Sequence, residues 1–407
     1  MINGVKMFNG TLDKLVRPEV TVLGRSWPAF QVCGVTGLGL AILLAMMLVM
    51  YLGLSPLVIA GLVAAALMAF LGLVMVTRII TGEERIIYYH HEIAVMMTAA
   101  LFLWLTHQPL LPYLDITILG IGAFLFCGRI GCLMVGCCHG RPSHWGVCYR
   151  PEHAEAGFAP YLVGVRLFPI QAVESLWVFC IVVAGITFIL RGWPPGTALA
   201  WYVVAYDAAR FCLEFLRGDA DRPYLLGFSQ PQWISVVLIC VVAWAEITGV
   251  ILFQGWHIMV TAGLMLAMIA ITLKRRFQRT PRYELLHPRH VREVAEALKL
   301  VNSTEDKTQD ASKWTAFPRS NIPTTLHLAR TSLGVQISAG RFRDVAGEVH
   351  HYTFSYRNGG MTEETARVLA DLVLRLLQAN DQGEVVNGNH QTFHLLVRPV
   401  SGKEPVC

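Results

Sequence analysis

Long apolar runs separated by short polar stretches fill the first two thirds of the chain. A helix needs about 20 mostly apolar residues to cross a lipid bilayer, and eight runs approach or reach this length. These runs cover residues 34–54, 57–77, 92–107, 112–128, 171–190, 197–217, 232–253 and 257–273. Several of them are short or contain a charged residue, so the pattern predicts seven or eight transmembrane helices after a polar N-terminal segment, residues 1–33.

The pattern becomes polar after residue 273. Residues 274–323 contain a basic flank, an amphipathic helix expected at 288–300, and a Ser-, Thr-, Asp- and Lys-rich stretch typical of a linker. The last segment, residues 324–407, predicts a small soluble domain of the α+β class. We expect strands within residues 324–340, 350–357 and 391–398. We expect one helix at residues 362–379, with Thr362 as its N-cap.

Composition supports a membrane protein. Charged residues make up 15% of the chain, against about 25% in soluble domains, and the mean hydropathy is +0.50. The 240 residues from Gly34 to Leu273 contain 22 charged residues, whereas the other 167 contain 39. This deficit excludes a purely soluble enzyme, a disordered chain and a secreted disulfide scaffold. It predicts an all-α polytopic membrane domain over residues 34–273.

The net charge of +5 is too small to indicate a nucleic-acid partner. Its placement is informative, because five basic residues follow the last apolar run and are typical of a cytoplasmic membrane flank. These residues are Lys274, Arg275, Arg276, Arg279 and Arg282. The first long apolar run begins too far into the chain, and is too long, for a cleavable signal peptide.

A glycine-rich run between residues 128 and 142 places charges where a membrane disfavours them. An ionisable residue at mid-helix costs about 2.5–3.5 kcal/mol on insertion scales, so Arg129 and Arg141 are functional candidates. Their guanidinium groups suit a phosphate, and glycines let a backbone approach a ligand closely. The glycines are Gly128, Gly131, Gly136 and Gly140. We expect an anionic lipid headgroup here, the alternative being an arginine that extends to the interface from a helix end.

A second group of polar residues lies in the run at 197–217. Tyr206, Arg210, Glu214 and Arg217 are spaced at i, i+4, i+8 and i+11, which places all four on one face of a helix. We expect this face to point into the bundle interior, with Glu214 holding the two arginines in place. The alternative is a purely structural Arg–Glu pair.

Two histidines begin the third apolar run, in the sequence Tyr88-Tyr89-His90-His91-Glu92. Histidine titrates near neutral pH, so His90 or His91 could accept a proton from a nucleophile. The two tyrosines equally suit an aromatic belt at the membrane interface. Four further histidines near the C-terminus lack ligand spacing and are expected to be strand or surface residues. They are His350, His351, His390 and His394.

Five of the ten cysteines are concentrated in one short stretch. They are Cys127, Cys132, Cys137, Cys138 and Cys148. With His139 they could ligate zinc, but the spacing matches no standard zinc signature and adjacent cysteines rarely bind one ion together. The sequence therefore predicts no metal site and no cofactor. A reactive thiol or a disulfide is the alternative, because neighbouring arginines lower a thiol pKa.

Taken in order, these motifs resemble the signature of the prolipoprotein diacylglyceryl transferase family. The resemblance extends from near Tyr88 to the seventh apolar run and leaves the C-terminal domain outside. The residues that carry it are Gly128-Arg129-Ile130-Gly131, Gly136, Gly140-Arg141-Pro142, Pro169-Ile170-Gln171-Ala172-Val173-Glu174, Tyr206-x-x-x-Arg210-Phe211-x-x-Glu214-Phe215-x-Arg217 and Gln232-Trp233-Ile234-Ser235.

The resemblance implies a multi-pass enzyme of the cell inner membrane. Members of the family move the diacylglyceryl group of phosphatidylglycerol onto the thiol of a lipobox cysteine in a prolipoprotein, and glycerol 1-phosphate leaves. It implies that Arg129 and Arg210 neutralise the lipid phosphate, that Tyr206 positions the headgroup, and that His91 or His90 activates the thiol. The remaining matched residues would bind or support the substrate: Gly128, Gly131, Gly136, Gly140, Arg141, Gln171, Glu174, Glu214 and Arg217.

The chain also departs from the family pattern. Cys132 and Val135 stand where the signature has Asn, and Cys137 stands where it has Glu. His90-His91-Glu92-Ile93 replaces a His-Gly-Gly-Leu segment. We interpret the chain as a divergent homologue that keeps the phosphate-binding arginines and phosphatidylglycerol as donor, with the acceptor, the family's cysteine thiol or another group, left open. Two other functions remain open: a thiol-dependent membrane oxidoreductase or acyl carrier using Cys137 or Cys138, and a non-catalytic lipid-binding module.

The predicted number of transmembrane helices decides on which side of the membrane the candidate site lies. The family acts at the outer face of the inner membrane, which would place residues 129–170 outside. Eight helices with the basic stretch 274–282 inside would place that loop inside. A count of seven removes the conflict without changing any candidate site residue.

Overall fold

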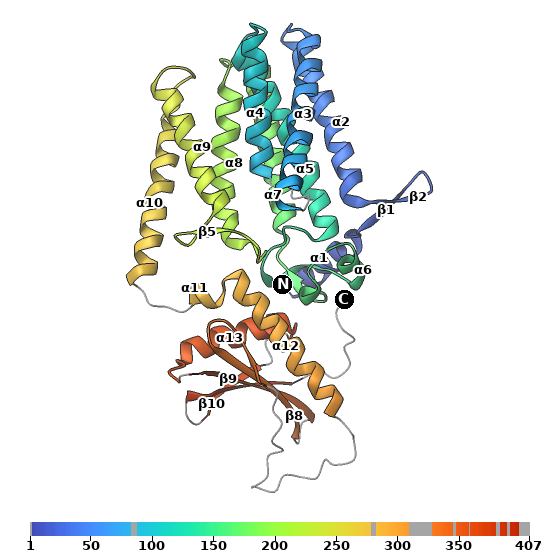
Figure 1. Ribbon diagram of the computed structural model, residues 1–407, viewed down its shortest axis with the longest axis vertical. Coiled ribbons are helices and arrows are strands. Elements are labelled where there is room, and N and C mark those ends of the chain that lie inside the picture. The colour runs from blue at the N-terminus through green and yellow to red at the C-terminus, as the bar shows by residue number, and fades with distance from the viewer. Residues whose placement is uncertain are drawn as a thin grey trace.

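The computed structural model describes residues 2–82, 88–277, 282–308, 328–344, 347–357, 359–379, 383–388 and 391–398. A bundle of long helices lies above a small layered body of helices and strands, and a belt of loops joins the two (Figure 1). The mostly helical architecture and the small C-terminal sheet agree with the sequence prediction.

The bundle contains a helix for each of the eight predicted apolar runs. The helices are α2 (Ala29–Tyr51), α3 (Pro56–Thr81), α4 (Tyr88–Leu105), α5 (Leu110–Val135), α7 (Ile170–Leu190), α8 (Thr197–Leu213), α9 (Gln230–Ile247) and α10 (Gly255–Phe277). Among the described residues, six of them are long and apolar enough to cross a membrane: α2, α3, α5, α7, α9 and α10. The other two, α4 and α8, run beside them (Figure 1).

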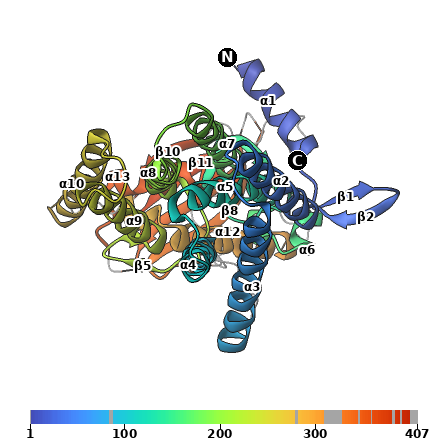
Figure 2. The same ribbon diagram turned by 90° about the horizontal axis from the view of Figure 1, so that it is seen from above.

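Helix α5 is the centre of the bundle. Seen from above, it lies among α2, α4, α7 and α8, while α3 and α10 lie at the edges (Figure 2). Glycines bring the neighbours close, because a Cβ on Gly37 of α2 would lie 2.9 Å from the Cβ of Cys127 on α5. Small residues at helix interfaces favour such packing in membranes, where no hydrophobic effect drives helices together.

Helix α8 is shorter than predicted, and this corrects the expectation of one helix over residues 197–217. It begins after Gly196, where Asp115 of α5 accepts hydrogen bonds of 2.7 Å from the backbone N–H groups of Gly196 and Leu199. It ends at Leu213, and a 3-10 turn, η2 (Glu214–Leu216), follows. Arg217 then adopts an extended conformation because its backbone pairs with Gly140.

The N-terminal segment folds against the loops. Helix α1 (Ile2–Leu15) and the hairpin of β1 (Glu19–Val22) and β2 (Arg25–Pro28) precede α2. Asp13 of α1 forms an ion pair of 3.0 Å with Arg166 and accepts a hydrogen bond of 2.9 Å from the N–H of Cys148. This polar segment therefore braces the stretch that follows α5.

The connecting loops are gathered at one end of the bundle. They contain β3 (Pro142–Cys148), α6 (Pro151–Glu155), η1 (Pro160–Leu162), β4 (Arg166–Leu167), β5 (Tyr224–Leu225) and β6 (Phe228–Ser229). The end of α10 and the small C-terminal body lie at this same end (Figure 1). Arg275, near the end of α10, donates a 2.7 Å hydrogen bond to the carbonyl oxygen of Gly227 and lies over the ring of Tyr283. Arg275, a member of the predicted basic flank, thus fixes the loop between β5 and β6.

The small body is a five-stranded antiparallel sheet with two helices packed on it. Its strands are β7 (Leu328–Arg330), β8 (Val335–Asp344), β9 (Gly347–Tyr356), β10 (Gly383–Asn387) and β11 (Phe393–Val397), in the order β10-β11-β9-β8-β7. The helices are α12 (Pro288–Thr308) and α13 (Glu363–Leu376), preceded by the short α11 (Arg282–Leu285). Thr362 caps α13 as predicted, because its side chain accepts a hydrogen bond from the Thr365 N–H at 3.2 Å. Strand β10 was not predicted.

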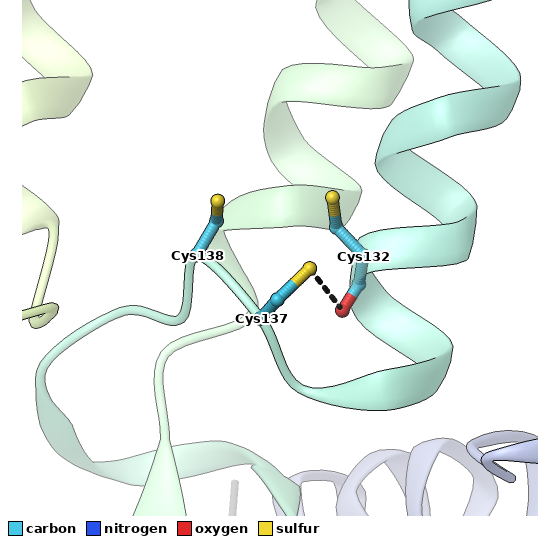
Figure 3. A group of neighbouring side chains, drawn as sticks. All are labelled: Cys132, Cys137 and Cys138. Carbon is cyan, nitrogen blue, oxygen red and sulfur yellow. Dashed lines mark hydrogen bonds between the residues drawn. The ribbon is translucent and has the colours of Figure 1, made fainter. Parts of the chain in front are cut away.

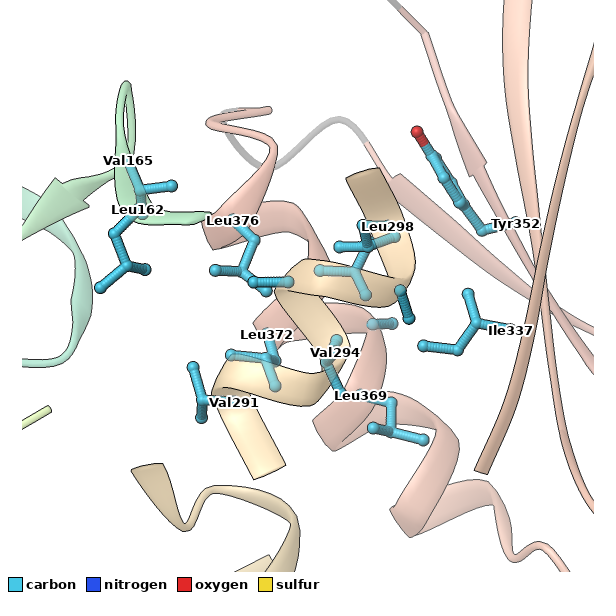
Figure 4. Close-up of a cluster of buried hydrophobic side chains, with 14 of the residues drawn as sticks. Leu162, Val165, Val291, Val294, Leu298, Ile337, Tyr352, Leu369, Leu372 and Leu376 are labelled. Atoms are coloured by element: carbon cyan, nitrogen blue, oxygen red, sulfur yellow. The ribbon is translucent and has the colours of Figure 1, made fainter. Parts of the chain in front are cut away.

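Apolar side chains of α12, α13 and the sheet form one core (Figure 4). Leu162 and Val165 from the loop after α5 belong to the same cluster, so the small body packs directly against the loops of the bundle. Helix α12 continues to Thr308, into the stretch predicted as a linker, and residues 309–323 lie outside the described residues. Of the four C-terminal histidines, His350 and His351 lie on β9 and His394 on β11, and His390 lies outside the described residues.

Candidate functional site

A single carboxylate in the first turns of α7 gathers the predicted polar residues. Glu174 is completely buried, and Arg129 of α5 and Arg210 of α8 each form an ion pair of 3.0 Å with it. The hydroxyl of Tyr206 donates a 3.0 Å hydrogen bond to Glu174 Oε1. Arg217 Nη1 lies 3.9 Å from Glu174 Oε2. Three guanidinium groups from distant parts of the chain therefore converge on one carboxylate.

A second layer of ion pairs surrounds this centre. Arg210 pairs with Glu214 at 2.5 Å, and Arg222 pairs with both Glu214 and Asp219. Arg217 forms two hydrogen bonds of 3.1 Å with Asp219. Burial raises the pKa of Asp219, but Arg217 and Arg222 outweigh it and hold the pKa at about 2. Glu214 therefore supports Arg210, as expected, whereas Asp219 supports Arg217.

The paired network contains four arginines and three carboxylates, and it leaves arginine donors unused. Arg129 Nε, Arg210 Nε and Arg217 Nη1 are buried and have no hydrogen-bond partner among the described residues. A buried donor without a partner costs about 1–3 kcal/mol. Unused donors on arginines that share one carboxylate are suited to an anion with several oxygens, because guanidinium groups bind phosphate in a fork geometry.

Backbone pairing holds the two arginine-bearing segments together. Gly140 and Arg217 form an isolated antiparallel bridge, and the Gly218 N–H donates to the carbonyl oxygen of His139 at 2.9 Å. Arg141 donates from Nε to the carbonyl oxygen of Arg217 at 3.3 Å. A Cβ on Gly218 would lie 2.9 Å from the carbonyl carbon of Gly140, so only glycine fits there. Arg141 thus supports the backbone of Arg217 in this structure.

The stretch at the start of α4 reaches the network through a tyrosine. The Tyr89 hydroxyl donates to Asp207 at 3.2 Å and lies 3.0 Å from the hydroxyl of Ser235, and its ring centroid is 6.2 Å from that of Tyr206. His91 is buried, with its ring 4.6 Å from the ring of Phe70. His90 Nε2 lies 3.1 Å from the side-chain nitrogen of Gln230 on α9.

The predicted glycines pack against protein in three of four places. A Cβ on Gly131 would lie 3.1 Å from Cys33 of α2, and one on Gly136, which ends α5 with φ +85°, would lie 2.6 Å from the Phe158 ring. Gly140 lies against the backbone of Phe168. Only Gly128 has open space around the position of a Cβ. Their contact with a ligand remains a prediction.

Three cysteines lie together beside the arginines. The Sγ atoms of Cys132, Cys137 and Cys138 are all within 4.8 Å of one another (Figure 3). Gln171, which was predicted to bind substrate, donates from Nε2 to the carbonyl oxygen of Cys137 at 2.9 Å. Hydrogen bonds from Cys132 and Cys137, together with Arg217 and Arg129, hold the pKa of the Cys138 thiol below its ordinary value against the effect of burial.

The structure thus brings together six of the fourteen predicted site residues. Arg129, Tyr206, Arg210, Glu174, Glu214 and Arg217 form one network. Asp219, Arg222 and Ser229, whose hydroxyl donates to Glu214 at 2.8 Å, were missed. The dense charges from Arg217 to Arg222 were the available signal, because such a run directly after a membrane helix departs from the charge-poor pattern.

Comparison with known proteins supports the family resemblance. Residues 57–248 match the sequence model of the family described as prolipoprotein diacylglyceryl transferase. Phosphatidylglycerol–prolipoprotein diacylglyceryl transferases from Dehalococcoides mccartyi and Clostridium tetani are each 30% identical to this chain, over 165 and 133 residues. Phosphatidylglycerol–prolipoprotein diacylglyceryl transferase 2 of Clostridium perfringens is 30% identical over 127 residues.

These alignments cover part of each protein. The three relatives align with 40%, 32% and 31% of this chain, and the aligned parts are 60%, 51% and 47% of their own lengths. The match contains α3 to α9 and with them every member of the ion-pair network. Helix α10 and the C-terminal body lie outside it. The resemblance to this family is therefore confirmed over residues 57–248.

Proposed function

We propose that this chain is a multi-pass transferase of the cell inner membrane. It would move the diacylglyceryl group of phosphatidylglycerol onto a cysteine thiol, as in the lipobox of a prolipoprotein. One observation carries the proposal: three buried arginines converge on Glu174, and each keeps a guanidinium nitrogen free of hydrogen bonds among the described residues. The similarity of residues 57–248 to the transferase family supports it.

The arginines would act on the leaving group. Sulfur attacks the terminal glyceryl carbon, a carbon–sulfur bond forms, and the carbon–oxygen bond to phosphate breaks with its electron pair on the phosphate. The phosphodiester, which carries one negative charge, becomes a phosphomonoester that gains a second. Preorganised donors aimed at developing charge stabilise such a transition state, and Arg129 and Arg210 present them. Tyr206 would hold the headgroup beside them.

The acceptor thiol must lose its proton in this reaction. An imidazole near neutral pKa is the usual acceptor, and we assign this role to His91 or His90 at the start of α4. Their neighbour Tyr89 packs beside Tyr206, which supports placing this end of α4 next to the phosphate site. Gln171 and the glycines would shape the loop around the headgroup. The reaction as written needs neither metal nor cofactor.

The membrane topology we propose has eight spans, with α4 and α8 added to the six apolar helices. The loops of the network, the end of α10 and the small body then lie on one side of the membrane, so the basic stretch 274–282 faces the same side as the site. A cysteine introduced at the exposed Leu226 and one at Glu296 of α12 should react with an impermeant maleimide from the same side, and one at Arg191 from the other. Labelling of the first two from opposite sides would exclude this count.

The decisive experiment is turnover. The purified full chain is incubated with labelled phosphatidylglycerol and a lipobox peptide, and the peptide is analysed by mass spectrometry. Arg129→Ala should reduce turnover about 100- to 1,000-fold, the effect of losing one preorganised donor. Arg191→Ala, at the exposed end of α7, should leave it unchanged. No diacylglyceryl group on the cysteine would refute the proposal.

The same assay separates the two alternatives. Cys137→Ser combined with Cys138→Ser should keep appreciable transfer, because neither sulfur takes part in the proposed step. Complete loss of transfer by a double variant whose circular dichroism and thermal stability match the parent chain would favour a thiol-dependent membrane enzyme instead. Lipid binding by the parent chain without any turnover would favour a non-catalytic lipid-binding module.

A further inference from the structure

The group of three cysteines has no part in the proposed transfer. Cys132 is buried in the last turn of α5, and Cys137 and Cys138 follow the residue that ends this helix. All three sulfurs lie within 4.8 Å of one another, and Cys137 is exposed (Figure 3). The group is therefore both compact and reachable from outside.

The backbone explains how adjacent cysteines can face a common point. Gly136 ends α5 in the left-handed region at φ +85°, and Cys138 is also left-handed at φ +55°. This conformation is uncommon for a residue other than glycine and costs about 1–3 kcal/mol. In Figure 3, Cys138 and Cys132 point in the same direction, with Cys137 between them. The strained turn thus overcomes the usual divergence of neighbouring side chains.

Surrounding hydrogen bonds fix this turn. Gln171 of α7 donates to the carbonyl oxygen of Cys137 at 2.9 Å, and Tyr149 donates to the carbonyl oxygen of Leu133 at 3.0 Å. These bonds hold the backbone that carries the sulfurs rather than the sulfurs themselves. Such outer contacts are what preorganise the ligands of protein metal sites.

The distances suit one metal ion. Zinc–sulfur bonds are about 2.3 Å long, so two sulfurs on a tetrahedral ion are separated by about 3.8 Å. The three sulfurs, all within 4.8 Å of one another, need to approach by no more than about 1 Å to reach this spacing. Three thiolates with a divalent ion carry a net charge of −1, and the Arg129 and Arg217 guanidinium groups that interact with Cys138 supply compensating positive charge.

We propose that Cys132, Cys137 and Cys138 bind one thiophilic d10 metal ion, Zn2+ or Cu+, through three thiolates. Binding releases the thiol protons to solvent and involves no change in oxidation state. Soft thiolate ligands select these ions over Mg2+ or Ca2+. The ion enters at the exposed Cys137. It stabilises the turn between α5, which carries Arg129, and Gly140, whose backbone pairs with Arg217. The site thus has a structural role next to the arginine network.

Metal content of the full chain tests the proposal without substrate. The protein is purified in detergent with a reductant and without chelators, and metal is measured by elemental mass spectrometry. Co2+ is then titrated as a spectroscopic probe and displaced with Zn2+, and Cu+ is titrated separately against a colorimetric chelator. We expect one equivalent of ion and a thiolate-to-cobalt charge-transfer band.

Matched variants locate the site. Cys132→Ser and Cys138→Ser should each weaken binding at least about tenfold, whereas Cys212→Ser, an exposed cysteine of α8, should bind like the parent chain. Size-exclusion profiles and circular dichroism check that each variant is folded. Less than stoichiometric binding by the parent, or binding unchanged in both variants, would overturn the proposal. So would a disulfide that joins two of these three cysteines, detected by peptide mapping of the non-reduced chain, whereas a disulfide at Cys148 has no bearing on the proposal.

Discussion

Two buried clusters meet at the same end of the bundle, and opposite physical effects stabilise them. The network around Glu174 consists of charges whose desolvation is offset mainly by their mutual pairing. The core of the small body, with Phe354 and Leu369 fully buried, consists of apolar side chains removed from water. Replacing a buried ion pair with apolar residues is often neutral or stabilising. The comparison indicates that the network is better explained by ligand binding than by a contribution to the stability of the fold.

Removing the central carboxylate should have the largest effect. Glu174→Gln keeps the shape of the side chain but leaves Arg129, Arg210 and Arg217 without their shared negative charge. Breaking a buried ion pair in this way costs about 3–5 kcal/mol. Thermal unfolding of the detergent-solubilised chain should show this loss, and transfer activity should fall with it.

The exposed Glu364 on α13 provides the control. Glu364→Gln should leave the unfolding midpoint within experimental error. If Glu174→Gln proves as stable as the parent, bound anion or water must already balance the arginines, and the ion-pair description of the centre is wrong.

A cavity in the small body should have a comparable but local effect. Leu369→Ala removes a fully buried side chain, which typically costs about 2–5 kcal/mol. Hydrogen exchange should accelerate in β8, β9 and α13, while α5 and α8 keep their protection. Arg367→Ala, on the exposed face of the same helix, should change neither region. Equal acceleration in the bundle would show that the two clusters unfold as one unit.

The outer layer of the network should depend on pH. The pKa of Asp219 is held at about 2, below the ordinary 3.8, so its carboxylate stabilises the fold above about pH 4 and this contribution disappears as pH falls towards 2. A difference of this size corresponds to about 2 kcal/mol. Asp219→Asn should be less stable at neutral pH, and its unfolding midpoint should fall less between about pH 5 and pH 2.

Asp221 is the matched control, since it is two residues away, 87% exposed and paired only at 3.5 Å with Arg292. Asp221→Asn should follow the parent at every pH. A parent-like pH profile for Asp219→Asn would mean that Arg217 and Arg222 do not depend on this carboxylate.

Particular residues also show which features could be predicted from the sequence and which could not. The eight helices were predictable because long apolar runs form most of each one, and Arg129 and Arg210 were conspicuous because charges are rare in such runs. The end of α8 was not, because it depends on pairing between Gly140 and Arg217, which local sequence does not encode. Strand β10 was missed because its residues are half-exposed and lack clear alternation. The convergence of Cys137 and Cys138 on Cys132 was also missed, because it depends on two left-handed residues, Gly136 and Cys138.

The smallest effect on stability is expected for an arginine–glutamate pair of the same spacing that is exposed to solvent. Arg210–Glu214 and Glu363–Arg367 both join residues four apart at 2.5 Å, but the side chains of the first pair are 4% and 1% exposed, those of the second 53% and 70%. Exposed pairs at this spacing contribute about 0.3–0.5 kcal/mol, and salt screens them. Glu363→Gln should therefore lower the unfolding free energy by no more than about 0.5 kcal/mol, and less at high salt. Glu214→Gln should lower it several-fold more, because Arg210 and Arg222 would remain buried without this carboxylate. Equal effects of the two substitutions in parallel unfolding measurements would show that water reaches the network, and the contrast between the two clusters would not hold.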